Sequence, residues 1–377
     1  MKVLHIINNL GSGGAEKLLE GLLPIMNNLE DVKIDLLLLS DTGNVFDKGL
    51  LERGVNIDVI PLRKNKNPIN VLYIKNYIVN GKYDVVHAHL FPTIYWVSIA
   101  SRLIFKGKPK FIYTEHSTHN RRRSKNILKP LERFVYSCFS KIISISDDVQ
   151  KNLVSFLRPK EKNIHKFTII YNGIDLNRFI EAEVYDKYKI NKTFTEDTIL
   201  ICMVGRFSNA KDQPTIIKAM CNLPEHIHLL LVGEGPLEEY NKQLAKKHGV
   251  SERVHFLGFR NDIERILKTS DIIIQSSNWE GFGLTAVEGM AAGKPVIASD
   301  IEGLRYLVGG AGILFEKGNY IELTRKIIRL IIDTSHYNAT KEKCFMRSKK
   351  YDIRQMANNH IDLYKTIVEG GRDIYEK

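Results

Sequence analysis

Short apolar runs alternate with amphipathic stretches along almost the whole 377-residue chain. The runs are rich in β-branched residues and almost continuously apolar, which is typical of strands buried on both faces of a parallel sheet. The stretches between them place apolar residues at helical spacing, as with Leu18, Leu22 and Ile25. The pattern therefore predicts an α/β fold with parallel sheets. The predicted strands are Val3–Ile7, Ile34–Leu39, Val85–His89, Phe111–His116, Ile142–Ser146, Thr168–Tyr171, Ile199–Val204, His228–Val232, Val254–Phe259, Ile272–Ser276, Val296–Ser299 and Gly312–Phe315.

The alternation lapses between Leu176 and Thr198, where charged and polar residues prevail, and a new series begins at Ile199. A chain of this length is too long for one ordinary core and suits two domains. We therefore expect two doubly wound, Rossmann-like domains of similar size that face each other across a cleft. The first would cover residues 1–178 and the second residues 179–355.

Composition limits the class of protein. Apolar residues make up 44% of the chain and charged residues 26%, as in a soluble globular protein. No apolar run approaches the roughly 18 residues that a membrane-spanning helix needs. The strand-like start of the chain does not resemble a signal peptide. The cysteines lack metal-ligand spacing and are expected to be reduced core residues of a cytosolic protein; they are Cys138, Cys202, Cys221 and Cys344.

The net charge of +12 is concentrated in one segment. Residues 102–141 include eleven basic and two acidic side chains, so this segment carries +9. Such a density favours a docking face for anionic lipid headgroups. A solvated basic surface and a nucleic-acid contact are the alternatives, although no nucleic-acid-binding motif supports the last. Arg121, Arg122 and Arg123 are the leading candidates for contact with a membrane or an acceptor.

Every unusual polar motif follows the end of a predicted strand, which is where open parallel sheets bind ligands. The most informative motif runs from Glu280 to Glu288, where an apolar strand enters a glycine turn that opens a helix. Backbone N–H groups and the helix dipole favour an anion at such a turn. Carboxylates accept strongly from hydroxyl groups. The motif therefore suits a ligand with both phosphates and vicinal hydroxyls, such as a nucleotide sugar.

Two cations surround the turn that follows strand Ile199–Val204. Arg206 comes directly after Gly205, and Lys211 lies five residues further along. Both side chains could meet a pyrophosphate and neutralise the charge that develops as it leaves. The alternative is an exposed surface pair.

Other strand ends carry weaker signals, because each is also compatible with an ordinary turn or a packed side chain. His116 could bind a sugar hydroxyl or transfer a proton, or it could be a structural histidine. Gly14 lies in a glycine-rich loop that would let the backbone approach a ligand. Gly233 begins a tight turn, and Arg260 follows a strand end whose backbone could read a base edge.

Taken together, these residues resemble glycosyltransferase family 4, the retaining enzymes of the GT-B fold. The matching motifs follow one another along nearly the whole chain: Gly13–Glu16, His87–His89, Glu115–His116, Asn172–Asp175, Val204–Arg206 with Lys211, Gly233–Pro236, Phe256–Gly258, Glu280–Glu288 and Gly293–Val296. Residues 356–377 resemble the helix that returns to the N-terminal domain in this family. Two positions depart from the pattern of many relatives, Tyr306 and the pair Glu115-His116, and they leave the transferred sugar open.

The resemblance implies a role for each matching residue. Arg206 and Lys211 would hold the donor diphosphate, and Glu288 would bind the ribose hydroxyls. Glu280 would hold the transferred sugar and phosphates together with backbone N–H groups of Phe282, Gly283 and Leu284. His116 would face the reacting sugar, Gly14 would close on the phosphates, and the turns at Gly205, Gly233 and Arg260 would complete the donor site.

The resemblance also implies a reaction that needs no metal or other cofactor. The expected donor is a UDP-sugar, or a GDP-sugar, and the expected acceptor is a lipid-linked or cell-surface glycan in polysaccharide, lipopolysaccharide or capsule biosynthesis. We expect the protein on the inner face of the cell membrane. Two alternatives stay open: a nucleotide-sugar epimerase of the same fold, and a non-catalytic sugar-nucleotide-binding subunit.

Overall fold

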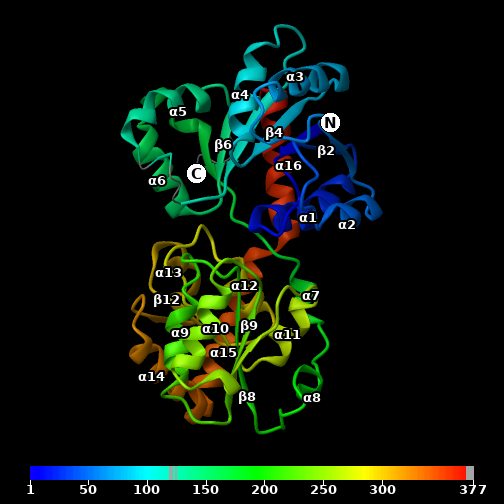
Figure 1. Cartoon of the computed structure of the whole chain (residues 1–377). Coiled ribbons are helices and arrows are strands. Elements are labelled where there is room, and N and C mark those ends of the chain that lie inside the picture. Colours follow the sequence, from blue (N-terminus) through cyan, green and yellow to red (C-terminus); the bar gives the residue numbers. More distant parts are fainter. Residues whose placement is uncertain (119–121, 124, 371–377) are drawn as a thin grey trace. The chain divides into compact units, whose positions relative to one another are not determined.

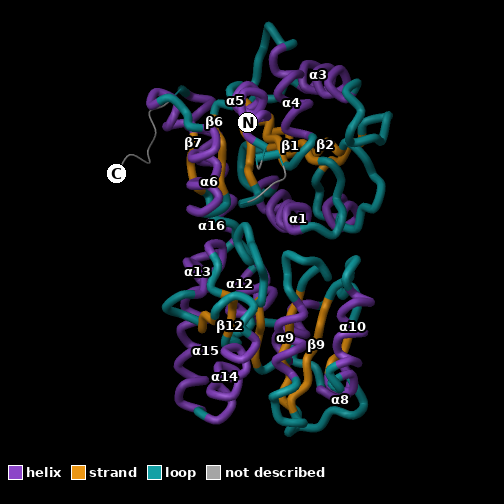
Figure 2. The backbone as a smooth tube through the Cα atoms, turned by 60° about the vertical axis from the view of Figure 1, so that its left-hand side comes forward, coloured by secondary structure: helices purple, strands orange, loops and turns teal. Residues whose placement is uncertain are grey.

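The computed structural model describes residues 1–118, 122–123 and 125–370. Across these residues the chain divides into two compact units. Unit 1 comprises Met1–Gly173 together with the chain from Ile353 onward, and unit 2 comprises Ile174–Asp352. Each unit is built around its own parallel sheet, with helices flanking the strands (Figures 1 and 2). The predicted α/β class with two Rossmann-like domains is confirmed.

The described part of unit 1 has a seven-stranded parallel sheet in the order β3-β2-β1-β4-β5-β6-β7. Its strands are β1 (Lys2–Ile7), β2 (Lys33–Leu38), β3 (Asn56–Val59), β4 (Val85–His89), β5 (Lys110–Glu115), β6 (Lys141–Ser144) and β7 (Phe167–Ile169). Its α-helices are α1 (Gly14–Asn27), α2 (Asp47–Glu52), α3 (Asn70–Gly81), α4 (Thr93–Arg102), α5 (Lys129–Tyr136), α6 (Asp147–Leu157) and α16 (Ile353–Glu369).

The described part of unit 2 has a six-stranded parallel sheet in the order β10-β9-β8-β11-β12-β13. Its strands are β8 (Ile199–Val204), β9 (Ile227–Val232), β10 (Val254–Phe256), β11 (Ile272–Gln275), β12 (Val296–Ser299) and β13 (Ile313–Phe315). Its α-helices are α7 (Leu176–Ile180), α8 (Lys187–Ile190), α9 (Gln213–Met220), α10 (Glu238–Lys247), α11 (Ile263–Thr269), α12 (Leu284–Ala291), α13 (Glu302–Val308), α14 (Tyr320–Ile332) and α15 (Thr334–Ser348).

Every predicted strand is present, with ends that differ by a few residues. One further strand, β3, is not indicated by the sequence pattern. Its side chains alternate between exposed and half-buried because it lies at the edge of the sheet, so it lacks the apolar run that marks the inner strands.

The boundary between the units falls earlier than residue 178. The helix α7 packs on α11 and α12, and Ile174 forms a β-bridge with Asp352, so both belong to unit 2. The return to unit 1 likewise occurs at Ile353, a few residues before the predicted position 356. These short polar segments gave no periodic signal from which the exact junction could be read.

In unit 1 the core lies on both faces of the sheet. On one face β1 and β2 pack with α1 and α16 through Leu19, Leu22, Ile361 and Tyr364. Figure 1 shows α16, the red helix, beside the blue α1, although the two are far apart in sequence. Among the described residues, no helix is both long and apolar enough to cross a bilayer. The cysteines are unpaired, and Cys221 is exposed at the end of α9, so the expectation of a core position was wrong for this residue.

Candidate active site

Both sheets reverse their strand order at one point, which is the position where doubly wound sheets bind ligands. In unit 1 the reversal lies between β1 and β4, and in unit 2 it lies between β8 and β11. The cationic turn at Arg206–Lys211 follows β8, and the turn with Glu280 follows β11. The strongest motifs of the sequence therefore lie next to each other, after the carboxyl ends of the two central strands of the unit 2 sheet.

The loops that follow β8 and β11 are tied together by hydrogen bonds. The backbone N–H of Asn278 donates to the carbonyl of Ala210 at 2.8 Å, and its side-chain amide donates to the carbonyl of Asn209, also at 2.8 Å. The hydroxyl of Ser276 donates to the carbonyl of Asp212 at 2.9 Å. These bonds fix the two loops as one platform, so the charged side chains on it have a defined separation.

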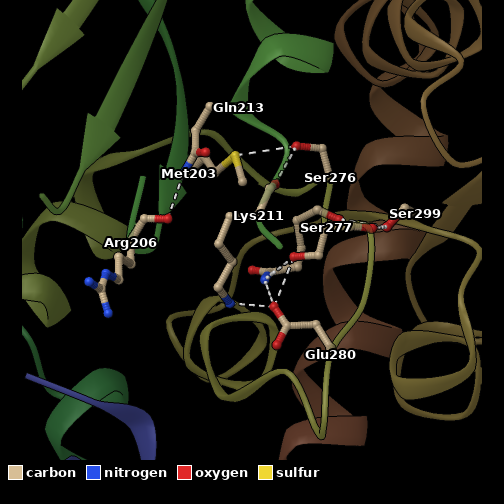
Figure 3. A network of polar contacts seen from close by, with 9 residues as sticks. Met203, Arg206, Lys211, Gln213, Ser276, Ser277, Glu280 and Ser299 are labelled. Carbon is tan, nitrogen blue, oxygen red and sulfur yellow. Dashed lines mark hydrogen bonds and ion pairs between the residues drawn. The ribbon is translucent and has the colours of Figure 1, made fainter. Parts of the chain in front are cut away.

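An ion pair between Lys211 and Glu280 lies at the centre of this platform (Figure 3). The same carboxylate oxygen, Glu280 Oε1, accepts from Gln275 Nε2 at 2.6 Å and from Ser277 Oγ at 2.8 Å. Ser277 is held in turn, because its carbonyl accepts from the hydroxyl of Ser299 at 2.5 Å. Glu280 is thus oriented by partners from two strand ends, and the Lys211 ammonium lies within its reach.

Arg206 is the second cation of the platform, and its side chain is exposed. Its backbone carbonyl accepts from Gln213 Nε2 at 3.2 Å, which anchors the residue. Its guanidinium has no ion-pair partner among the residues that the structure describes. Figure 3 shows the Arg206 and Lys211 side chains extending in the same direction, with the guanidinium apart from the Lys211–Glu280 pair. Arg206 is therefore available to an anionic ligand.

Close backbone contacts explain the glycines at the ends of β8 and β9. Gly233 has a φ of +130°, and a Cβ there would lie 2.4 Å from the carbonyl oxygen of Gly205. A Cβ on Gly205 would lie 3.3 Å from the Lys211 stem. Glycine therefore lets the two turns touch and lets Lys211 lie against the backbone.

Helix α12 begins directly after the turn that carries Glu280. Its N-cap is Gly283, whose φ is +96°, and a Cβ there would lie 2.5 Å from Leu304. Within the described residues, no hydrogen-bond acceptor is found for the backbone N–H groups of Phe282, Gly283 and Leu284. Free N–H groups at a helix start attract anions. Glu288 lies one turn further along α12 and is buried.

Arg260 lies at the end of β10, the edge strand, and binds an internal carboxylate. Its guanidinium donates to both oxygens of Asp262, at 2.8 and 2.6 Å, and Tyr185 also donates to this carboxylate. These hydrogen bonds lower the pKa of Asp262 below its usual range, first through Arg260. The Arg260 guanidinium is thus already paired with Asp262. Its predicted contact with a donor stays a prediction.

In unit 1, His116 follows β5 and Gly14 begins α1. His116 is half-buried, and its Nε2 lies 3.1 Å from Nδ1 of His89. Burial lowers the pKa of His116 to about 3, helped by repulsion from His360, so its imidazole is neutral at pH 7. Gly14 has open space where a Cβ would be, which leaves room for a ligand to approach its backbone.

The arginines of the basic segment do not lie as predicted for a docking surface. Arg123 pairs with Glu115 at 2.9 Å, and its side chain is only 7% exposed. The Arg122 guanidinium lies 4.3 Å from the centre of the Phe91 ring and 3.5 Å from Glu132 Oε1. Both side chains turn inward because unit 1 offers them buried acids, which the sequence does not reveal. Arg121 lies outside the described residues.

The side chains that orient the predicted site residues could not be assigned this role from the sequence. Gln275 and Ser277 hold Glu280, and His89 holds His116. A signal was present for the first two, because the stretch Gln275–Ser277 is a polar end to an otherwise apolar strand. Their partner could be identified only once the fold brought it close.

Two family models match the chain, one for each half. The model described as "Glycosyltransferase Family 4" matches residues 12–178, and the model described as "Glycosyl transferases group 1" matches residues 184–345. The second match contains the whole platform of Arg206, Lys211, Glu280 and α12.

Several curated proteins with similar sequences are named as glycosyltransferases. The chain is 30% identical over 312 residues to the UDP-Gal:alpha-D-GlcNAc-diphosphoundecaprenol alpha-1,3-galactosyltransferase of Escherichia coli, covering 76% of each chain. It is 26% identical over 362 residues to the N-acetylgalactosamine-N,N'-diacetylbacillosaminyl-diphospho-undecaprenol 4-alpha-N-acetylgalactosaminyltransferase of Campylobacter jejuni, covering 94% of this chain and 96% of the relative.

The fold also matches solved structures. The crystal structure of Anabaena HepE in complex with UDP and glucose superposes with a TM-score of 0.82 and 23% sequence identity. The match covers 97% of this chain and 100% of the Anabaena chain. At this identity the similarity shows the fold alone.

Proposed function

The chain belongs to the family 4 glycosyltransferases of the GT-B fold, and we propose that it moves a sugar from a UDP-sugar to a lipid-linked glycan with retention of the anomeric configuration. The observation that carries the proposal is the Lys211–Glu280 pair on the platform at the strand-order reversal of unit 2. This platform combines cations, an oriented carboxylate and free N–H groups, which are the groups that a sugar diphosphate needs.

Each group on the platform takes one part of the donor in this proposal. Arg206 and Lys211 bind the diphosphate, whose charge increases as the glycosidic bond breaks. Glu280 accepts hydrogen bonds from hydroxyls of the transferred sugar, and the N–H groups at the start of α12 bind phosphate oxygens. Glu288, buried one turn further, accepts from the ribose hydroxyls. Lys211 then exchanges its internal carboxylate partner for the donor.

The reaction proposed here needs no protein nucleophile and no metal ion. The bond between the anomeric carbon and the diphosphate breaks, and the acceptor hydroxyl forms its new bond on the same face of the sugar. Its proton moves to the departing diphosphate oxygen. The protein contributes positioning and charge stabilisation, and in this proposal the Arg206 and Lys211 side chains supply the second.

The names of the relatives support the choice of donor and acceptor. The Escherichia coli relative is named for UDP-Gal and for an acceptor on diphosphoundecaprenol, and the Campylobacter jejuni relative is named for a diphospho-undecaprenol acceptor. The Anabaena structure contains UDP. We therefore place this chain in the assembly of a surface polysaccharide, on an acceptor that is anchored in a lipid bilayer.

Such an acceptor requires the enzyme to work at the membrane surface, and unit 1 offers a fitting surface. Phe105 is 88% exposed and Ile127 is 86% exposed, which is unusual for large apolar residues. Arg102 joins this region to α5, because its guanidinium stacks 3.9 Å from the centre of the Phe134 ring. We define the apolar–basic surface as the exposed residues Leu103, Phe105, Lys106, Lys108, Lys125, Ile127, Leu131, Arg133 and Phe134.

Exposed apolar side chains together with lysines are the composition of interfacial membrane anchors. The apolar–basic surface replaces Arg122 and Arg123 in the docking prediction, since those arginines pair with buried acids. On this proposal the protein is peripheral on the inner face of the cell membrane, where the lysines meet anionic headgroups.

The proposed activity is tested by incubating the purified chain with undecaprenyl-diphosphate-linked GlcNAc and a panel of radiolabelled UDP- and GDP-sugars. We expect one UDP-sugar to yield a lipid-linked disaccharide, with the anomeric configuration of the donor by NMR, and an equal yield in EDTA. Lys211→Ala should abolish the product, whereas Lys242→Ala, which removes an exposed lysine of α10, should not. Inversion at the anomeric carbon would contradict the proposed mechanism.

Two other outcomes would point to the alternatives. Conversion of a UDP-sugar in the absence of any acceptor would indicate an epimerase. Tight binding of the donor with no product from any acceptor would indicate a binding subunit.

A further inference from the structure

A group of histidines gathers on the α16 side of the unit 1 sheet, and only His116 among them is expected from the sequence to face the reacting sugar. His5 of β1 pairs in register with His87 of β4, and His89 lies two residues further on the same face. His5, His87 and His89 are almost completely inaccessible to solvent. Polar rings at such positions need hydrogen-bond partners, because burying an unpaired polar group is costly.

Three of these rings form a hydrogen-bonded chain that leads from the strand ends into the core. His116 Nε2 lies 3.1 Å from His89 Nδ1, and His89 Nε2 lies 3.0 Å from His5 Nδ1. At the inner end, His5 Nε2 is buried and has no partner among the described residues. At the outer end, His116 Nδ1 has no partner within the described part of the chain and is left for a ligand.

All three rings are neutral at pH 7. Burial lowers the pKa of His5 to about 3, and it lowers that of His89 well below the usual value, with repulsion from His5 and His116 added. A neutral imidazole carries one N–H, so each ring donates through one nitrogen and accepts through the other. The hydrogen-bonded row of His116, His89 and His5 then has only two arrangements. All three rings change tautomer together when it switches between them.

In the first arrangement His116 donates inward through Nε2, His89 donates to His5, and His5 is left with a buried N–H that has no acceptor. In the second arrangement His5 donates outward through Nδ1, His89 donates to His116, and His5 Nε2 is left with only a lone pair. Orphaned buried N–H groups are rarer in proteins than under-used acceptors. The unpaired end at His5 therefore selects the second arrangement.

We propose that His5 and His89 are positioning residues that fix His116 in the tautomer with its proton on Nδ1. His116 then offers an N–H to the reacting sugar as a neutral hydrogen-bond donor, and it cannot act there as a base. The use of this donor by a sugar rests on the proposed function, whereas the tautomer itself does not. The tautomer of His116 is thus determined by His5, at the inner end of the hydrogen-bonded row of rings.

The same cluster could hold a metal ion, since one ligand atom each from His5, His87 and His89 lies within 4.8 Å of the others. The observed contacts favour hydrogen bonds. Both His87 nitrogens already have partners, Tyr364 OH at 2.5 Å and Thr114 Oγ1 at 2.7 Å. A zinc ion at about 2.0 Å from each nitrogen would have to break these bonds and replace the proton between His5 and His89.

The tautomer can be measured directly in the full-length protein without any substrate. With histidine labelled by 15N, long-range 1H–15N correlation distinguishes the protonated from the unprotonated ring nitrogen, and His116→Gln assigns the signals. We expect a protonated Nδ1 and an unprotonated Nε2 for His116. Protonation on Nε2 would overturn the proposal, as would a stoichiometric zinc ion that the protein retains on dialysis and loses in His5→Asn.

Two substitutions of His5 test its control over His116. Asn can donate from the position of Nδ1, so His5→Asn should keep the Nδ1 proton of His116. An ionised Asp can only accept, so His5→Asp should move that proton to Nε2 at pH values at which the new carboxyl has lost its proton. If His5→Asp does not fold, the wild-type spectrum and the comparison of His5→Asn with wild type still test where the His116 proton lies.

The effect on transfer separates this inference from the proposed function. Relative to His5→Asn, the kcat of His5→Asp should fall by about a hundredfold with little change in donor KM, as when one transition-state hydrogen bond is lost. A reversed tautomer with unchanged kcat would show that His116 is not used as a donor. If neither the wild-type protein nor the variants transfer a sugar, the proposed function fails. The NMR spectrum of the wild-type protein still tests the tautomer.

Discussion

Mild acid should destabilise unit 1, because its buried histidines stay neutral in the folded state and take up protons on unfolding. His5, His87, His89 and His360 lie in the core of this unit, and burial lowers the pKa of each, to about 3 for His5 and about 4 for His360. In the unfolded chain each regains a pKa of about 6.5. The unfolded state therefore binds more protons below pH 6.5, and the free energy of unfolding falls as the pH falls.

The size of the effect follows from the difference in bound protons. Between pH 7.5 and 5.5 each histidine that stays neutral in the folded state costs about 1.4 kcal/mol of stability. The four together cost about 5 kcal/mol, and His116, whose pKa is also lowered to about 3, adds a fifth contribution of the same size. A domain is usually stable by about 5–15 kcal/mol, so this loss brings unit 1 close to its unfolding midpoint at pH 5.5.

The two tryptophans of the chain allow the units to be followed separately, since Trp96 belongs to unit 1 and Trp279 to unit 2. In Trp279→Phe, urea unfolding followed by tryptophan fluorescence should shift to much lower urea between pH 7.5 and 5.5. In Trp96→Phe the shift should be smaller, because the shifted histidines of unit 2, His228 and His255, are only partly buried.

A variant tests the cause of the acid effect. His360→Leu removes one of the four groups and should reduce the pH dependence of unfolding by about 1.4 kcal/mol over the same range. A midpoint for unit 1 that does not change between pH 7.5 and 5.5 would refute the reasoning, because it would mean that these rings are protonated in the folded state.

Other perturbations test the donor platform and the membrane surface. Gly233→Ala should destabilise unit 2 by roughly 2 kcal/mol or more in urea unfolding, because its φ of +130° is strained for alanine and the added Cβ meets the Gly205 carbonyl. Gly249→Ala, with a φ of +69° and open space, should cost only about 1 kcal/mol, and equal losses would contradict the role of the contact. Glu280→Gln should fold normally but lose at least about a hundredfold in kcat/KM for transfer, and near-normal turnover would exclude it from the site. Phe105→Ser together with Ile127→Ser should reduce sedimentation with anionic vesicles, while turnover of a detergent-solubilised acceptor stays unchanged; undiminished sedimentation would reject the apolar–basic surface.

The fold was largely predictable from the sequence because buried parallel strands leave a local signal. An apolar run such as Ile272–Ile274 is visible without knowledge of its neighbours. β3 escaped because an edge strand has one side facing solvent and so reads as an ordinary polar stretch. The junction at Gly173 escaped because it depends on which unit the short helix α7 packs against.

The site was predictable where a strand is followed by charged residues and glycine. It was not predictable where two side chains far apart in sequence pair in the fold. Lys211 and Glu280 could be assigned to one site because each follows a strand of the same sheet. Arg123 could not be assigned to Glu115, since a run of arginines shows its charge but not the direction in which each side chain turns. His5 carried no signal at all, because a single histidine in an apolar strand gains meaning only from the rings beside it.

Helix α16 has a consequence for how the protein is made. It belongs to unit 1 and supplies Ile361 and Tyr364 to the core beneath β1 and β2, yet it is translated after all of unit 2. Domains usually fold in order as they leave the ribosome. Here unit 1 keeps an uncovered apolar face until α16 has been synthesised. We therefore expect unit 2 to complete its fold first. A chain truncated before residue 353 and released from the ribosome should therefore expose unit 1 to proteases while unit 2 is already protected.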